Sequence, residues 1–202
     1  MYRLSLSTLL LCAGAAYSQT SELGLMLGRI SGPARAATDG RPLDLSSGLA
    51  LEANFGYRFA RTGRVAWLAE IHGLANGLRE IHSPINAATR DVATAYITPG
   101  LRVKYLAARH FSPYGAIGGG YALYEQSYYT IDGAGNQAPR FTHRGAFDYG
   151  GGVDFPVKRW IGGRVEVRDF LTGSPSFNVP AGGGQHNVVF SYGFVLLFGR
   201  GE

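Results

Sequence analysis

The stretch GLALEANFGYRFARTGRVAWLAEIHG, residues 48–73, alternates apolar and polar side chains on both sides of a short connection. A period of two places Leu51 and Phe55 on one face of a strand and Glu52 on the other. The pattern predicts two antiparallel strands, Gly48–Phe59 and Val65–Gly73. One face of each strand is apolar and the other is charged, so the fold depends on which face is turned toward water.

The same alternation recurs along the chain and predicts eight strands. The connections between them alternate between short (near 60–64, 106–110 and 158–160) and long (near 31–46, 74–92, 126–140 and 171–185). Tight turns on one side and long loops on the other are typical of up-and-down barrels in the bacterial outer membrane. The facing of the glycine-dense fifth strand stays open. The predicted strands are Glu22–Ile30, Gly48–Phe59, Val65–Gly73, Ala93–Tyr105, Phe111–Glu125, Phe141–Val157, Ile161–Phe170 and His186–Phe198.

Composition also favours an all-β protein. Thirty of the 202 residues are glycine, 12% are aromatic and only 16% are charged. Stretches rich in Ala, Leu, Glu and Lys, which favour helices, are hard to find. The net charge is +5, but basic residues do not cluster with aromatic ones, so we expect no nucleic-acid partner.

The first 18 residues are typical of an export signal. Arg3 gives a positive start, Leu4–Ala16 is apolar, and small residues precede a predicted cleavage after Ser18. We therefore expect a signal peptide at 1–18 and one barrel domain at 19–202. Cys12 is the only cysteine and follows Leu11 rather than a small residue, so we expect neither a lipid anchor nor a disulfide. After the signal, no apolar run approaches the ~20 residues of a spanning helix.

Two features favour a membrane barrel over a soluble one, in which the apolar face would point inward. Several predicted strands reach the ~9–11 residues that a tilted strand needs to cross the hydrocarbon. Aromatic residues also gather at strand ends beside the short connections, where an interfacial girdle would lie. They are Tyr57, Phe59, Tyr105, Phe111, Phe155 and Phe198.

The polar face carries six acidic and six basic residues, and this balance is the third feature. Charges enclosed in a lumen must compensate one another, because an unpaired buried ion costs several kcal/mol. Toward lipid, each Arg or Lys at the midplane would cost ~2–4 kcal/mol. We therefore predict a polar interior, which in an eight-stranded barrel is filled by side chains and leaves no diffusion pore. The predicted inward charges are Glu22, Glu52, Glu70, Asp148, Asp154, Glu166, Arg58, Arg102, Lys104, Arg144, Arg164 and Arg168.

Three stretches carry a family likeness: FSPYGAIGGGYALY (111–124), FDYGGGVDFPVKRWIGGRVEVRDFLTG (147–173) and HNVVFSYGFVLLF (186–198). They resemble the small bacterial outer-membrane β-barrel proteins, the OmpA-like barrel group. The resemblance implies recognition of the last strand by the outer-membrane insertion machinery, through Tyr192, Phe194, Leu196 and Phe198. The chain departs from the pattern by continuing to Glu202 after the last aromatic residue.

No stretch of the chain predicts a catalytic, cofactor-binding or metal site. The glycine runs 115–120 and 150–152 lack the Gly-Lys-Ser/Thr of a phosphate loop, so we interpret them as positions where strands bend and pack closely. His186 and Ser191 are five residues apart and face opposite sides of a strand, which disfavours a lipid A deacylase. The five histidines show no metal-ligand spacing. They are His72, His82, His110, His143 and His186.

Taken together, these patterns predict a monomeric barrel in the outer membrane of a Gram-negative-type bacterium, with no cofactor and no enzymatic activity. Its partners would be membrane lipid, the insertion machinery and an unidentified partner of the long outer loops. Arg61, Arg64, Arg109, Lys158 and Arg159 in the short connections would lie near lipid headgroups or in solvent. A soluble periplasmic ligand-binding barrel is the alternative, and a lipid-modifying outer-membrane enzyme ranks third.

Overall fold

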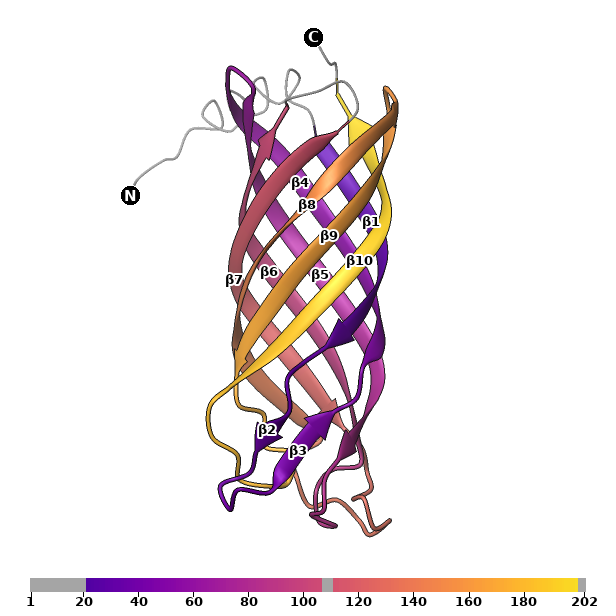
Figure 1. Ribbon diagram of the computed structural model, residues 1–202, viewed down its shortest axis with the longest axis vertical. Helices are drawn as coiled ribbons and strands as arrows, with labels where there is room; N and C mark the ends of the chain where they lie inside the picture. The colour runs from indigo at the N-terminus through magenta and orange to yellow at the C-terminus, as the bar shows by residue number, and fades with distance from the viewer. Residues whose placement is uncertain (1–20, 107–110, 200–202) are drawn as a thin grey trace, which may run out of the picture.

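The computed structural model of the protein describes residues 21–106 and 111–199. Eight long antiparallel strands form a closed ring, drawn as a tall barrel in Figure 1. The all-β, eight-stranded, up-and-down prediction is confirmed. The ring strands are β1 (Ser21–Ser31), β4 (Gly48–Thr62), β5 (Val65–His82), β6 (Asp91–Tyr105), β7 (Ser112–Gln126), β8 (Phe141–Lys158), β9 (Ile161–Gly173) and β10 (Gly184–Phe198).

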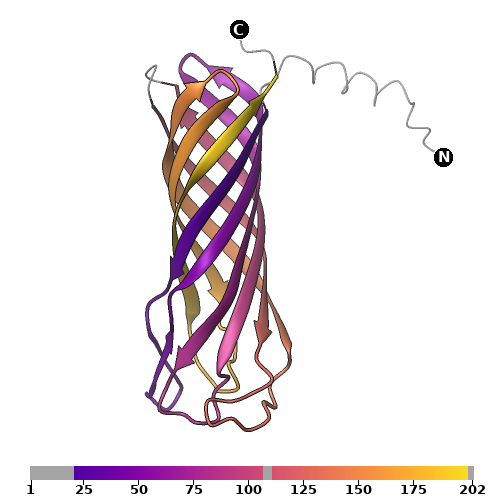
Figure 2. The ribbon, with the colours of Figure 1, turned by 90° about the vertical axis from the view of Figure 1, so that its right-hand side faces the viewer.

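The ring closes because the first strand pairs with the last. β1 and β10 are in register from Ser21↔Phe198 to Ser31↔Val188, and Figure 2 shows the two strands side by side. Each of the other ring strands pairs with the ring strands that precede and follow it in the chain, so the ring has no free edge. The predicted signal at 1–18 and most of the connection 106–110 lie outside the described residues.

No helix long and apolar enough to cross a membrane occurs among residues 21–106 and 111–199.

β5 is nine residues longer than the sequence predicts, ending at His82 rather than Gly73. The register shifts between Asn76 and Arg79, and this β-bulge leaves Gly77 and Leu78 both exposed. The bulge interrupts the period-two pattern that marks a strand in the sequence. As a result, the second long connection shrinks from 74–92 to 83–90.

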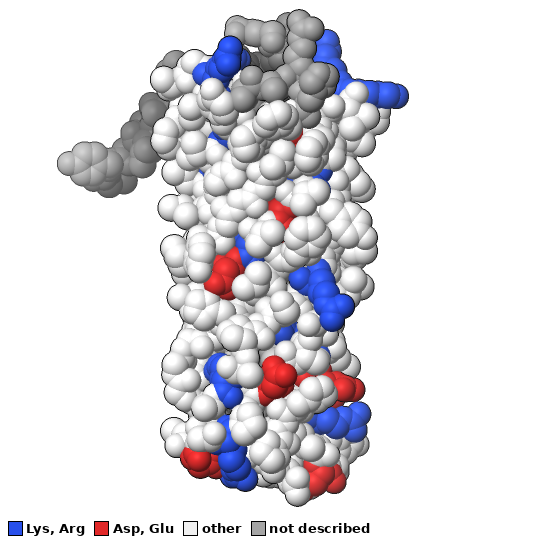
Figure 3. All heavy atoms as spheres, in the orientation of Figure 1, with Lys and Arg blue, Asp and Glu red and all other residues white. Residues whose placement is uncertain are grey.

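The apolar face of the ring points outward and the charged face inward, as predicted. Leu51 is 59% exposed and Phe194 is 45% exposed, whereas Glu52 is 4% exposed and Arg164 is 1% exposed. Figure 3 shows an outer wall that is mostly uncharged, with many of the charged groups gathered near the loop end. Aromatic side chains are exposed beside the short turns, where the girdle is predicted, although the predicted member Tyr57 is half-buried. The exposed ones are Phe59, Tyr105, Phe111, Phe155, Trp160 and Phe198.

The long connections fold over the opposite end of the barrel. Two of their segments form a small hairpin, β2 (Arg35–Ala36) with β3 (Pro42–Leu45), and β3 also pairs with the end of β5. An apolar cluster fills the space beneath them. It joins loop residues such as Leu43, Ile85 and Phe177 to strand residues such as Ile30 and Phe170.

Candidate functional site

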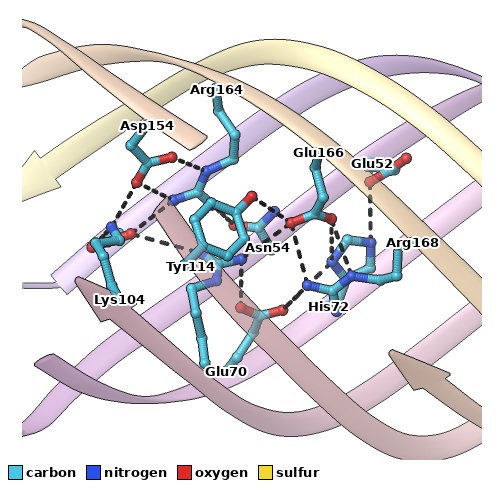
Figure 4. Close-up of polar contacts among 12 residues, drawn as sticks. Glu52, Asn54, Glu70, His72, Lys104, Tyr114, Asp154, Arg164, Glu166 and Arg168 are labelled. Carbon is cyan, nitrogen blue, oxygen red and sulfur yellow. Dashed lines mark hydrogen bonds and ion pairs between the residues drawn. The ribbon is translucent and has the colours of Figure 1, made fainter. Parts of the chain in front are cut away.

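The barrel interior holds a continuous set of charged side chains at mid-height and toward the short turns, which we name the interior charge network. They come from six strands, because every second residue of β1, β4, β5, β6, β8 and β9 points inward. All of them are at most 6% exposed, and Figure 4 shows most of them converging on one another. The members are Glu22, Glu52, Glu70, His72, Arg102, Lys104, Asp148, Asp154, Arg164, Glu166 and Arg168.

Arg164 organises the half of the network that lies nearer the short turns. Its guanidinium donates to both carboxylate oxygens of Asp154 at 2.6 and 2.9 Å. It also donates to Glu22 Oε2 at 2.9 Å and to Asn54 Oδ1 at 2.7 Å. Lys104 contacts the same two acids, and its Nζ lies 2.6 Å from Asp154 Oδ2. These bonds satisfy the guanidinium almost completely, which a buried charge requires.

Arg168 organises the other half of the network. It donates to Asp148 at 2.6 Å, to Glu70 at 2.8 Å and to Glu166 at 3.1 Å. Arg102 contacts Glu70 and also lies 3.8 Å from Glu166. This half therefore shares its carboxylates among neighbouring cations and behaves as a network rather than as separate pairs.

Tyr114 joins the two halves. Its hydroxyl donates to Glu166 at 2.6 Å, while the guanidinium carbons of Arg102 and Arg164 lie 4.6 and 5.0 Å from its ring centroid. An aromatic face attracts cations more strongly when water is excluded. The sequence pattern placed Tyr114 in the strand of open facing, so its place in the network was not predicted.

Ten of the twelve predicted inward charges are buried, whereas Arg58 and Arg144 are only half-buried. Arg58 lies where the β4–β5 register shifts near the short turn. Arg144 donates to the Ser174 carbonyl and thus turns toward the loops. Arg79, which the sequence pattern missed beyond the β5 bulge, is 1% exposed and donates to Asn187 at 2.9 Å.

The four long connections are linked to one another, and we name them together the loop platform: residues 32–47, 83–90, 127–140 and 174–183. Arg35 donates to Ser174 at 2.9 Å and lies over the Phe177 ring. The Thr89 amide donates to the Phe177 carbonyl at 3.0 Å. The Ile131 amide donates to the Ala88 carbonyl at 2.9 Å, which joins the loop 127–140 to the loop 83–90. Phe177 is 1% exposed, so the platform closes over the barrel end.

The outer surface of the platform carries exposed aromatic and charged side chains. Tyr128 is 70% exposed. The Arg140 guanidinium lies over its ring, 4.0 Å from the ring centroid, and Arg140 also pairs with Glu125 at 2.5 Å. Elsewhere on the surface, Arg41 donates to Asp39 at 2.6 and 2.8 Å and holds the pKa of Asp39 below its usual value. Tyr and Arg are enriched where proteins bind partners.

Two of the described histidines, His72 and His186, lie in different environments. His72 is fully buried among the carboxylates of Glu52, Glu70 and Glu166, a placement that sequence spacing did not indicate. His186 lies on the outer wall, where Nδ1 is 2.7 Å from Asp169. Ser191 is buried on the inner face, so His186 and Ser191 do face opposite sides. The strand registers, which bring His72 opposite Asn54, are the signal that could have found the buried cluster.

Comparison with known proteins adds a fold but no family. No protein-family model matches the sequence, and no curated protein matches it either. Among solved structures, the outer membrane protein OprG from Pseudomonas aeruginosa is similar, with a TM-score of 0.61 and 13% identity over 91% of this chain and 98% of that chain.

Two further structures are similar over 89% of this chain and 97% of theirs. Neisserial surface protein A matches with a TM-score of 0.53 and 13% identity. Ail, the attachment invasion locus protein of Yersinia pestis, matches in its complex with the heparin analogue sucrose octasulfate, with a TM-score of 0.50 and 14% identity. The chain thus has the fold of small eight-stranded outer-membrane barrels, and the narrower OmpA-like resemblance stays a prediction.

Proposed function

We propose that the protein resides in the outer membrane of a Gram-negative-type bacterium and acts at the cell surface through its loop platform. The outward apolar wall with its aromatic girdle supports the location, since exposed apolar side chains at this density are suited to lipid. The platform surface supports the role. Similar barrels include one named a surface protein and one named an attachment invasion locus protein.

The observation that carries the surface role is the mutual locking of the four loops. Loops that hold one conformation present a preformed surface, and a partner then binds without the cost of ordering them. Hydrogen bonds between different loops, such as Thr38 to Pro180 at 2.8 Å and Asn178 to Ala87 at 2.7 Å, provide this order. Tyr128 and Arg140 are the side chains that we expect to contact the partner.

We infer further that the barrel is a closed, monomeric, non-enzymatic anchor. The interior charge network fills the middle of the lumen and the platform covers one end, an arrangement suited to stability rather than to diffusion. Alternate residues of β10 face outward, Tyr192, Phe194 and Phe198 among them, and would serve recognition by the insertion machinery. A soluble barrel with an apolar pocket is less favoured, because the inward faces at mid-height are charged.

Single-cysteine labelling tests both the location and the orientation. Gln137→Cys lies in the platform and Arg159→Cys lies in a short turn, and both positions are exposed. In intact cells we expect a membrane-impermeant maleimide to label Gln137→Cys, and Arg159→Cys only after the cells are broken. Labelling of Arg159→Cys in intact cells, or recovery of the folded protein in the soluble periplasm, would contradict the proposal.

Whole-cell attachment tests the surface role itself. Cells that display Tyr128→Ala together with Arg140→Ala should lose most of any attachment to host-cell monolayers that the unchanged protein confers. Leu101→Ala on the outer wall is the matched control and should attach normally. Planar-bilayer recording should be silent, and steady single-channel steps would contradict the closed lumen.

A further inference from the structure

The interior charge network contains more negative than positive groups. Six carboxylates are buried in it, against four side chains that are always cationic at neutral pH. The acids are Glu22, Glu52, Glu70, Asp148, Asp154 and Glu166, and the cations are Arg102, Lys104, Arg164 and Arg168.

Arg79, the remaining buried cation among the described residues, does not reduce this excess locally. It bonds to Asn187 at 2.9 Å and to the carbonyls of Ser46 and Leu45 at 2.6 and 3.4 Å. The buried groups of the network therefore carry two more negative than positive charges, and half-buried Arg58 lines a pocket with Glu22, Lys104 and Asp154 rather than with Glu52. His72, the only other basic group in it, could offset at most one of them.

The excess is localised at Glu52. Five of the six carboxylates contact an arginine or the lysine, whereas the only basic group described within 4.0 Å of Glu52 is His72, with Nε2 at 3.3 Å from Oε2. Ser191 also lies 3.4 Å from Oε2. A buried carboxylate without a permanent cation is costly, so the surroundings of Glu52 are incomplete.

Unpartnered atoms converge at the same place. Oε1 of Glu52 and both ring nitrogens of His72 are buried without a hydrogen-bond partner among the described residues. Glu166 Oε1 lies 3.9 Å from His72 Nδ1. One ligand atom from each of Glu52, His72 and Glu166 can be chosen so that all three lie within 4.8 Å of one another, and Figure 4 shows these side chains facing each other.

We propose that Glu52, His72 and Glu166 bind one divalent first-row transition-metal cation, with zinc as its representative, inside the barrel. A divalent cation with a neutral imidazole removes both excess charges at once. One imidazole nitrogen and two carboxylate oxygens suit zinc, whereas calcium and magnesium prefer oxygen ligands alone. Ser191 would support Glu52 from outside the ligand set. Because the ligands come from β4, β5 and β9, bound metal would link three strands across the lumen.

Metal analysis of the folded barrel tests this assignment. The full chain is refolded in detergent once with EDTA and once with zinc sulfate, and bound zinc is measured after gel filtration of material whose heat-dependent gel mobility shows that it is folded. We expect about one zinc per chain in the zinc preparation, and at least a fivefold loss in Glu52→Gln and in His72→Gln. His186→Gln is the matched control, because it removes the partly exposed His186–Asp169 pair on the outer wall, and it should keep its zinc.

Folded protein that binds no zinc under either condition overturns the proposal, as does zinc that is lost only in His186→Gln. If both interior variants fail to refold, cobalt added to the unchanged chain decides. Visible absorption bands of bound cobalt that zinc displaces support the site, and their absence overturns it. If calcium raised the unfolding midpoint as much as zinc does, the assignment to a first-row transition metal would be wrong.

Thermal unfolding separates a metal site from a simple ion pair between Glu52 and a protonated His72. The metal site predicts that zinc raises the unfolding midpoint of the unchanged chain, because metal binds only the folded state. It also predicts that Glu52→Gln, which removes an excess charge, raises the midpoint in EDTA and abolishes the effect of zinc. A lower midpoint for Glu52→Gln in EDTA, with no response of the unchanged chain to zinc, would establish the ion pair instead.

Discussion

Arg164 shows how this barrel keeps a charge in its centre. Four hydrogen bonds, to Asp154, Glu22 and Asn54, replace the water that a guanidinium would otherwise hold. Removal of such a cation leaves buried carboxylates without compensation. This loss costs far more free energy than the intact ion pair contributes when it is compared with a well-packed apolar core. The network therefore ties β1, β4, β8 and β9 to a single register.

Arg164→Met should lower the free energy of unfolding by about 3–5 kcal/mol, because it removes one partner from a buried ion network. Urea unfolding in lipid bilayers, followed by the fluorescence of Trp67 and Trp160, measures the change. Arg61→Met, at the exposed end of β4, is the matched control and should stay within about 0.5 kcal/mol. Equal effects of the two substitutions would show that the interior charges do not stabilise the fold.

The sequence predicts most of the inward charges, because alternation within a strand fixes which face a residue occupies. This prediction fails where a side chain is held by a contact that alternation along one strand does not encode. Arg144 turns toward the loops because the Ser174 carbonyl, on a loop thirty residues away in sequence, offers it an acceptor. His72 shows a second limit. Alternation places it beside Glu70 on the inner face of β5, but Glu52 and Glu166 come from β4 and β9, and only the strand registers bring these two to His72.

At the scale of the strand, glycine allows neighbouring backbones of β6 and β7 to approach closely. A Cβ at Gly100 would lie 2.7 Å from the Gly118 Cα and nearer still to the Ile117 carbonyl oxygen, whereas a Cβ at Gly145 would meet nothing within 4 Å. The sequence-based interpretation of the glycine runs as packing positions agrees with this geometry. It could not say which glycines are required.

Gly100→Ala should therefore destabilise the barrel by about 1–3 kcal/mol, the usual cost of overpacking. Gly145→Ala, also on a strand, should be neutral or stabilising by up to about 1 kcal/mol, because alanine restricts the unfolded chain. Urea midpoints of the two refolded variants provide the comparison. A Gly145→Ala variant that is the less stable of the two would refute this account of strand packing.

The bulge in β5 gives a second prediction for a strand. Ile97 lies on the outer face of β6 about midway between its ends and is 53% exposed, while Leu78 is 72% exposed at the bulge near the loop end. Ile97→Arg should cost about 2–4 kcal/mol and Leu78→Arg about 0–1 kcal/mol, because the cost of arginine on the lipid face falls with distance from the midplane. Folded fractions after refolding into bilayers measure both. Equal folded fractions of the two arginine variants would contradict a lipid midplane near the middle of β6.

At the scale of the whole molecule, the two ends of the barrel differ in what could be predicted. The rhythm of short and long connections predicted which end carries the loops, because connection length is visible in a sequence. It did not predict that the loops pack into one platform. That packing depends on contacts such as Arg35 with Ser174 and Thr89 with Phe177, which join segments far apart in the chain. No local pattern encodes them.

A disulfide between two loops tests whether the platform is held in one arrangement. Ala37 and Ala181 form an antiparallel bridge, and such pairs have Cα separations of about 4.5–5.5 Å, which a disulfide can span. Ala37→Cys with Ala181→Cys should oxidise spontaneously after export and stabilise the barrel by up to about 2–4 kcal/mol relative to its reduced form. Non-reducing gels and urea midpoints with and without reductant measure both effects. Ala37→Cys with Arg159→Cys, which places the second thiol in a short turn at the opposite end, should form no internal bond. Free thiols in the first pair after oxidation would mean that the loops move independently, and the case for a preformed contact surface would fail with them.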